Sequence, residues 1–174
     1  KDFHDGTSFA TILEDVAKLG IPRLRFMTSH PWDFTDEMLD VIARYPNIMK
    51  CIHLPVQSGS TSMLRIMGRR YSRESYLDLV KRIRERIPEC AITTDIIVGF
   101  PGETEDDFQR TLEVVEASRF SSAFTFQYSI RPGTKAAAME QLRAAVKERR
   151  AARAAEVASQ MHRAYLEGCV GQVY

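Results

Sequence analysis

The chain has 174 residues, of which 44% are hydrophobic and 27% are charged, as in an ordinary globular domain. Its 24 Lys and Arg residues nearly balance 23 Asp and Glu residues, which excludes a uniformly basic surface of the kind that coats DNA or RNA. No stretch is long and apolar enough to cross a membrane, and none has the pattern of a signal peptide. We therefore expect a cytoplasmic protein with no membrane and no DNA partner.

Three cysteines, Cys51, Cys90 and Cys169, lie far apart in the sequence, and their spacing fits no zinc, iron–sulfur or CxxC redox motif. We expect them to be free thiols in a reducing compartment, and we assign no metal ligand among them. The chain begins at Lys1 rather than at a methionine, so we expect a piece of a longer protein.

Four short runs rich in β-branched, aromatic and aliphatic residues predict strands at 24–29, 50–57, 92–100 and 123–129. Between them, apolar residues at helical spacing predict helices at 35–45, 72–87 and 104–118. The last of these begins with a capping-box-like sequence at 104–107. Strands that alternate with helices in this way indicate βαβ units, and therefore a parallel sheet.

The second and third strands have one mixed polar face and one apolar face. Cys51, His53 and Gln57 alternate with aliphatic residues, and so do Thr93 and Asp95. An apolar side that meets helices and a polar side that lines a lumen favour a partial (β/α) barrel of the TIM type over an open doubly wound sheet. Four strands are too few to close a barrel, so we expect only part of one.

Ligands of parallel α/β folds gather at the carboxyl ends of the strands, and here the loops at 28–32, 57–60, 99–104 and 129–134 follow those ends. The first residues of 57–60, Gln57 and Ser58, precede a helix start that attracts anions or hydroxyl groups, although a plain capping turn is the alternative. The loop at 99–104 could likewise be only a tight turn.

Asp95 is the most informative single residue, because a carboxylate inside a barrel is costly unless it is paired or hydrogen-bonded. Ribose hydroxyls could satisfy it, and so could Arg69 or Arg70. His53 has no carboxylate or cysteine at the spacing of a catalytic dyad, so we expect a hydrogen-bonded lumen residue there.

Residues 136–166 are Ala-rich and predict a long helix. The part at 141–165 carries six Lys and Arg residues against two Glu, and such a stripe could contact phosphates. The alternative is an ordinary solvated face, because Val146, Val157 and Met161 form a packing stripe.

Five motifs occur together in the sequence. They are TSHP at 28–31, IHLPVQSGS at 52–60, MGRRY at 67–71, TDIIVGFPGET at 94–104 and RPGT at 131–134. In this order and spacing they resemble the radical S-adenosylmethionine methylthiotransferases. The tRNA type, which adds a methylthio group to C2 of N6-isopentenyladenosine at position 37, is the best match.

The resemblance implies the later strands of a radical SAM partial barrel, with S-adenosylmethionine and two 4Fe-4S clusters in the full-length protein. One cluster cleaves S-adenosylmethionine reductively to a 5′-deoxyadenosyl radical, which takes a hydrogen from C2 of the adenine, and the second cluster delivers sulfur. Gln57, Ser58, Arg69, Asp95 and Gly99 are implied as cofactor contacts, and the anticodon stem-loop of tRNA as the partner.

The family holds its radical-generating cluster with a CxxxCxxC motif and a second cluster with three cysteines of a preceding domain, and neither set is in this sequence. We therefore expect this chain alone to be inactive. Residues 1–135 correspond to the later part of the barrel. Residues 136–174 correspond to a basic helix that leads toward an RNA-binding TRAM-like domain.

Other functions stay open at this point. A sister tRNA enzyme that acts on threonylcarbamoyladenosine shares much of the pattern, and another relative modifies a ribosomal protein. A hypothesis of another class is a module that binds nucleotide or RNA through the strand-end loops without radical chemistry.

Overall fold

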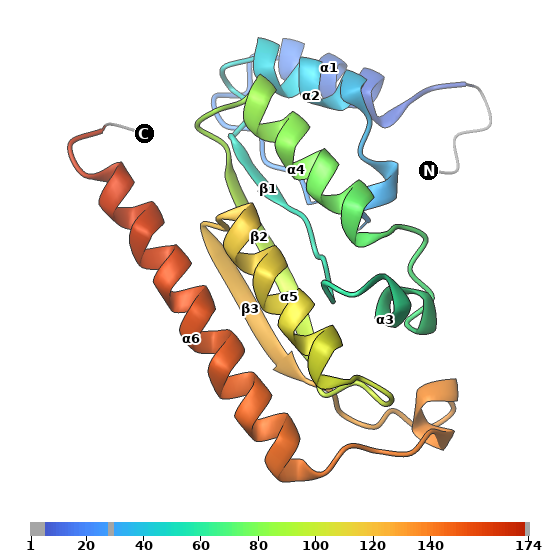
Figure 1. Ribbon diagram of the computed structural model, residues 1–174. Helices are drawn as coiled ribbons and strands as arrows, with labels where there is room; N and C mark the ends of the chain where they lie inside the picture. The colour runs from blue at the N-terminus through green and yellow to red at the C-terminus, as the bar shows by residue number, and fades with distance from the viewer. Residues whose placement is uncertain (1–5, 28–29, 173–174) are drawn as a thin grey trace.

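The computed structural model describes residues 6–27 and 30–172 (Figure 1). In chain order its elements are α1 (Phe9–Lys18), the 3-10 helix η1 (Pro31–Asp33), α2 (Asp36–Arg44), β1 (Cys51–His53), α3 (Thr61–Ile66), α4 (Arg73–Arg86), β2 (Ala91–Val98), α5 (Glu105–Ser118), β3 (Ser122–Gln127), the 3-10 helix η2 (Lys135–Ala138) and α6 (Ala144–Cys169). Among the described residues, no helix has both the length and the apolar character needed to span a bilayer.

The three strands form a parallel sheet in the order β1-β2-β3, which confirms the predicted α/β class. The predicted strand at 24–29 is mostly wrong: within its described part, only Leu24 pairs, in a single parallel bridge to Ile48. The Leu24 N–H donates to the Asn47 carbonyl, and the Leu24 carbonyl accepts from the Met49 N–H. Two residues of the run, Thr28 and Ser29, lie outside the described residues, and Met27 is exposed, so little apolar burial supports a longer strand there.

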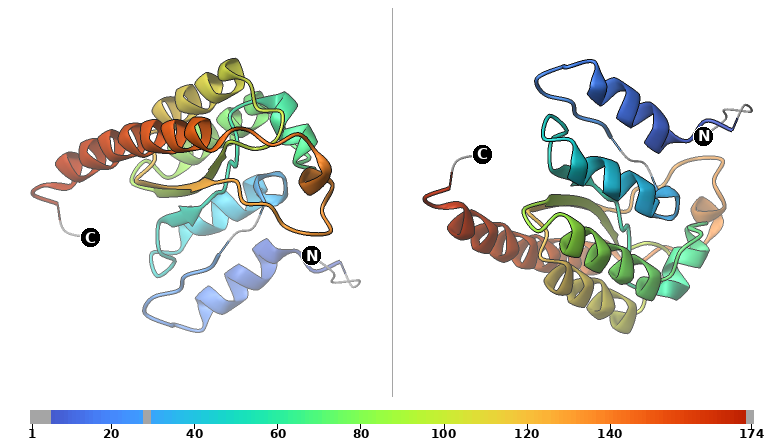
Figure 2. Two further views of the ribbon diagram at one scale, coloured as in Figure 1. Left: turned by 90° about the horizontal axis from the view of Figure 1, so that it is seen from below. Right: turned by 90° about the horizontal axis from the view of Figure 1, so that it is seen from above.

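The helices form an outer layer in which each packs on the next. α1 contacts α2, α2 contacts α4, α4 contacts α5, and α5 contacts α6, while α6 also covers β3. Figures 1 and 2 show α4 and α5 side by side on one face of the sheet. One layer of helices over one face of a parallel sheet is the arrangement of a partial barrel, because the other face is left as a lumen.

Alternation along the strands sends one set of side chains into this helical layer. Ile52, Leu54 and Val56 are fully buried, as are Ile92 and Ile96. On β1 and β2, the residues that alternate with them, including Cys51, His53 and Asp95, are only partly buried. The predicted division into an apolar helix-facing side and a polar lumen side is confirmed.

The helix predicted at 136–166 begins later than expected. Residues 135–138 form η2, and α6 starts only at Ala144. The Gln141 side-chain amide donates to the carbonyls of Ala136 and Met139, and so satisfies groups that a continuing helix would have used. The helix then runs to Cys169, past the predicted end.

Arg150 of α6 does not belong to the exposed basic stripe that the sequence predicted. Its side chain is only 5% exposed, and its Nη1 lies 2.7 Å from the Glu103 carboxylate and 2.9 Å from the Glu103 carbonyl oxygen. Its Nη2 bonds to Glu105, which also pairs with Arg149. Arg150 is therefore unavailable to a phosphate group, and it fastens α6 to the loop at 99–104.

Glu103 also binds the backbone at the end of β2. Its Oε2 accepts a hydrogen bond of 2.8 Å from the Gly99 backbone N–H, directly after β2. Burial raises the pKa of the Glu103 carboxyl, and the Gly99 N–H and the Arg150 guanidinium oppose that shift. The loop after β2 is thus held by a buried ion pair rather than by turn geometry alone.

We predict that Arg150→Leu lowers the free energy of unfolding by about 3–5 kcal/mol, because it leaves the Glu103 carboxylate buried without its partner. Arg153→Leu is the matched control: its ion pair with Glu156 is exposed, so its loss should cost less than about 1 kcal/mol. Urea unfolding of both variants measures the difference. Equal effects would contradict a structural role for the buried pair.

Asp107 of α5 joins the loop after β1 to the start of α5. Its Oδ1 accepts hydrogen bonds from the hydroxyls of Ser60 and Ser62, and its Oδ2 accepts from the backbone N–H and hydroxyl of Thr104. Thr104 and Asp107 form the capping box predicted from the sequence. Burial alone would raise the pKa of Asp107, but the hydrogen bonds from Ser60 and Thr104 outweigh it and hold the pKa at about 2.

Because the pKa of Asp107 is lower in the folded chain than its usual value of 3.8, its ionisation stabilises the fold above pH 4. This contribution, about 2 kcal/mol, should disappear as the pH falls from about 4 to about 2. We expect Asp107→Asn to be less stable than the wild type at pH 7 and the gap to close over that interval. Urea unfolding at a series of pH values measures it, and a gap independent of pH would contradict the assignment.

Candidate functional site

A β-bulge turns the chain after β1. His53 pairs with Thr93, but the next bridge joins Gln57 to Ile96, so the first chain has one residue more than its partner between the two points. Gln57 has φ of 66°, a left-handed conformation that a non-glycine residue rarely adopts. Backbone bonds hold it there: its N–H donates to the Asp95 carbonyl, and its own carbonyl accepts from Ile97.

Side chains satisfy the backbone groups that the bulge frees. The Thr94 hydroxyl donates to the Leu54 carbonyl and accepts from the Val56 N–H. The Tyr76 hydroxyl donates to the Leu54 carbonyl and the Tyr71 hydroxyl to the Val56 carbonyl. Burial raises the pKa of Tyr71 to about 12, so its hydroxyl remains a donor at neutral pH. The bulge is therefore a built feature that aims the Gln57 side chain.

Asp95 lies in the middle of β2 on the lumen side, where its carboxylate meets His53. His53 Nε2 is 3.5 Å from Asp95 Oδ2, and His53 Nδ1 is 2.9 Å from Thr93 Oγ1. The expectation of a hydrogen-bonded lumen histidine is confirmed, and the fold adds a carboxylate partner that the sequence spacing around His53 did not indicate. The partner comes from the neighbouring strand, two residues beyond the position that pairs with His53.

Arg69 reaches the same region from the loop after α3. Its backbone N–H bonds to the Leu64 carbonyl, and its Nη1 lies 3.2 Å from His30 Nδ1. The His30 ring in turn stacks on Trp32 at 4.2 Å between ring centroids. This places a half-buried guanidinium across the strand ends, whereas Arg70 beside it is exposed.

A pocket of about 640 Å³ opens at the carboxyl ends of the strands and brings three of the predicted site residues together. Gln57, Arg69 and Asp95 all line it. The other residues that line it are Ile66, Met67, Ile97, Phe100, Phe126, Gln127, Tyr128, Ser129, Arg131, Thr134, Lys135 and Ala136. Polar groups of opposite charge therefore converge in a cavity with apolar and aromatic walls, which is the usual make-up of a small-molecule site.

Tyr128 adds a polar atom that the sequence interpretation missed. Its hydroxyl is buried and has no hydrogen-bond partner among the described residues. The Phe100 ring packs edge-on against it at 4.9 Å, and the Lys147 ammonium lies 5.3 Å from its centroid. A buried hydroxyl without a partner in a pocket wall costs free energy unless a ligand or water bonds to it. Its signal in the sequence was weak, because an aromatic residue at a strand end is more often a core residue.

The other two predicted site residues do not line this pocket. Ser58 is fully buried, and its hydroxyl lies 3.4 Å from the Thr111 hydroxyl of α5. Gly99 has φ of 71° and donates its N–H to Glu103, and a Cβ there would come within 2.6 Å of the Lys147 side chain. Both positions shape the strand-end loops, and their direct contact with a ligand stays a prediction.

Comparisons with known proteins agree on the family. The model of the Radical SAM superfamily matches residues 2–115. A tRNA-2-methylthio-N(6)-dimethylallyladenosine synthase of Staphylococcus epidermidis is 60% identical over 129 residues, which is 74% of this chain and 25% of that protein. The chain thus spans about a quarter of the length of the curated relatives it matches.

Solved structures share the fold at low sequence identity. Coproporphyrinogen III oxidase from Escherichia coli, a radical SAM enzyme, has a TM-score of 0.69 and 16% identity, over 88% of this chain and 38% of that one. The radical S-adenosylmethionine methyltransferase TsrM from Kitasatospora setae has a TM-score of 0.54 and 18% identity, over 68% of this chain and 24% of that one. The match of the family model and the shared architecture lead to one conclusion. The chain belongs to the Radical SAM superfamily.

Proposed function

We propose that this chain is the S-adenosylmethionine-binding part of a tRNA methylthiotransferase that adds a methylthio group to C2 of N6-dimethylallyladenosine at position 37, in the anticodon stem-loop. The convergence of Gln57, Arg69 and Asp95 on one strand-end pocket is the observation that carries the proposal. The 60% identity to a tRNA-2-methylthio-N(6)-dimethylallyladenosine synthase supports the choice of substrate. Such an enzyme would act in the cytoplasm.

The residues of the pocket fit S-adenosylmethionine group by group. A guanidinium such as that of Arg69 suits the carboxylate of the methionine part. The carboxylate of Asp95 suits the ribose hydroxyls, and His53 leaves it partly exposed to do so. The unpartnered hydroxyl of Tyr128 and the ring of Phe126 suit an adenine, which offers both acceptors and a flat face.

The residues of this chain do not fit an iron–sulfur cluster. Within 6–27 and 30–172, no three His, Cys, Asp or Glu side chains lie close enough to hold a metal ion. Cysteine ligands for one or two 4Fe-4S clusters would belong to other parts of the longer protein. When S-adenosylmethionine is bound and cleaved at such a cluster, it supplies the oxidising power needed to remove hydrogen from an unactivated carbon. This chain would bind and orient it.

We predict that Asp95→Ala in the full-length protein weakens S-adenosylmethionine binding about tenfold or more, because the ribose loses a charged hydrogen-bond partner. Equilibrium dialysis measures the Kd, and iron and sulfide content shows that the clusters remain assembled. Asp78→Ala, which removes an exposed carboxylate of α4, is the matched control and should leave the Kd unchanged. An unchanged Kd in Asp95→Ala would remove this residue from the site.

The substrate is tested with the full-length enzyme and three tRNAs, which carry dimethylallyladenosine, threonylcarbamoyladenosine or unmodified adenosine at the target position. We expect a methylthio product from the first alone, detected as a mass increase of the nucleoside by mass spectrometry. Product from the threonylcarbamoyl substrate would favour the sister enzyme. Binding of RNA without any product, in an enzyme with assembled clusters, would favour a non-catalytic module.

A further inference from the structure

Two phenylalanines of β3 are unusually exposed for residues inside a strand. The side chains of Phe124 and Phe126 are 53% and 51% exposed, whereas Ile92, Ile96 and Val98 of the neighbouring strand are fully buried. They alternate along β3, so they lie on the same face of the sheet. The face is aromatic where a solvated surface would be polar.

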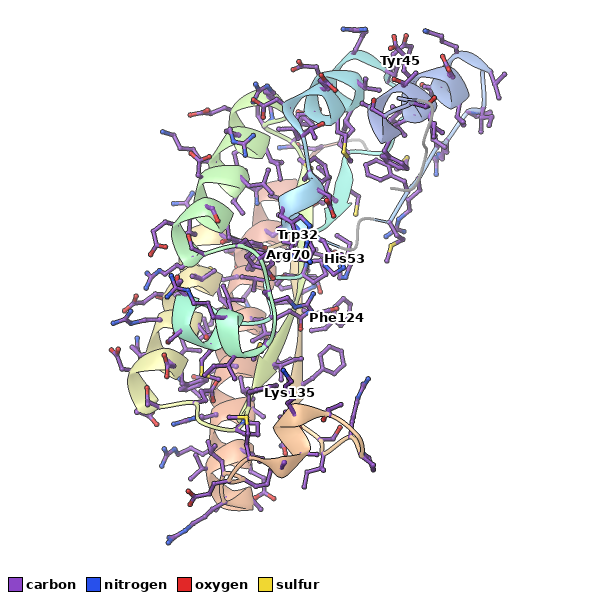
Figure 3. All side chains as sticks on the ribbon, turned by 90° about the vertical axis from the view of Figure 1, so that its right-hand side faces the viewer. Trp32, Tyr45, His53, Arg70, Phe124 and Lys135 are labelled. Carbon is purple, nitrogen blue, oxygen red and sulfur yellow. The ribbon has the colours of Figure 1, made fainter. Side chains whose placement is uncertain are left out.

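This face is the lumen side, next to the pocket. Phe124 pairs in register with Asp95, and Phe126 with Ile97. Figure 3 shows Phe124 and His53 on the side of the sheet that faces away from α4 and α5. Phe126 lines the pocket and Phe124 does not, so the aromatic surface begins in the pocket and continues along the strand beyond it.

Positive charge borders the same region. Arg131 and Lys135 are exposed and line the pocket on the η2 side, and neither has an ion pair among the residues that the structure describes. Lys135 lies on the same open side as Phe124 (Figure 3). An aromatic surface bordered by free cations suits a nucleic-acid base attached to a phosphate backbone.

We propose that Phe124 and Phe126 form the wall that receives the target base and reads its apolar N6 substituent. This inference rests on the proposed function, because it takes the modified adenosine as substrate. The polar groups of S-adenosylmethionine belong at the Gln57, Arg69 and Asp95 end of the pocket, which leaves the aromatic surface for a second, more apolar ligand. A dimethylallyl group buries apolar area on such a wall, and a planar base stacks on it.

The two rings lie at different positions relative to the pocket and therefore contact different ligands. Phe126 lies where the pocket and the aromatic surface join, so it borders both ligands. Phe124 lies beyond the pocket, so it contacts the substrate alone. Phe124 is therefore the residue whose replacement separates substrate recognition from cofactor binding.

The test measures binding of two stem-loop RNAs to the full-length enzyme, one with dimethylallyladenosine and one with plain adenosine at the target position. Fluorescence anisotropy gives each Kd in the presence of S-adenosylmethionine. For Phe124→Ala we expect about a tenfold loss on the dimethylallyl RNA and less than a twofold change on the plain RNA. The Kd for S-adenosylmethionine should not change. Phe124→Leu, which keeps apolar bulk, should lose less of the preference.

Leu166→Ala is the matched control, because it removes an equally exposed apolar side chain, 50% exposed, from α6 on the outer layer. It should change neither Kd. A wild-type enzyme without preference for the dimethylallyl RNA would defeat the proposed function itself. A wild-type preference that Phe124→Ala retains would overturn only the present inference, and so would an equal loss on both RNAs.

Discussion

The pairing of the Gln57 backbone with β2 is the constraint on which the site depends. Because the bulge before Gln57 adds one residue to the first chain, the residues that follow change their register against β2. This shift takes carbonyl and N–H groups out of the hydrogen-bond ladder. The hydroxyls of Thr94, Tyr71 and Tyr76 bond to these groups and so offset the free-energy cost. Gln57 and Asp95 then line one pocket, although Gln57 follows β1 and Asp95 lies within β2.

The outer layer of helices is connected to the same pocket. Asp107 ties the loop after β1 to α5, and the pair of Glu103 and Arg150 ties the loop after β2 to α6. Each connection joins a strand-end loop to a helix through buried or half-buried polar groups. The position of the loops is therefore set by helices that themselves contribute few residues to the pocket.

Alternation of apolar and polar residues was enough to predict the two faces of β1 and β2, because a period of two leaves few other arrangements. It could not predict the contact between His53 and Asp95, since that contact depends on which residues of two strands stand opposite each other. Nor could it predict the burial of Arg150: a helix full of arginines looks solvated until the position of Glu103 is known. The late start of α6 depends on the side chain of Gln141, which no helix propensity reports.

For the site, the motifs identified the polar half. Gln57, Arg69 and Asp95 stand in patterned segments after or within strands, and the structure brings them to one pocket. Tyr128, Phe124 and Phe126 carried no motif, because aromatic residues in a strand usually form the core. What distinguishes them is their position, on β3 for the two phenylalanines and directly after it for Tyr128, combined with their exposure or missing partner.

The left-handed backbone of Gln57 sets stability against function at one position. An L-residue with a side chain is disfavoured in this conformation by about 1–2 kcal/mol, and glycine is not. A glycine at this position would relieve the strain but would also remove the side-chain amide. Under the proposed function, the Gln57 amide contacts the ligand, and this contact compensates for the strain of its backbone.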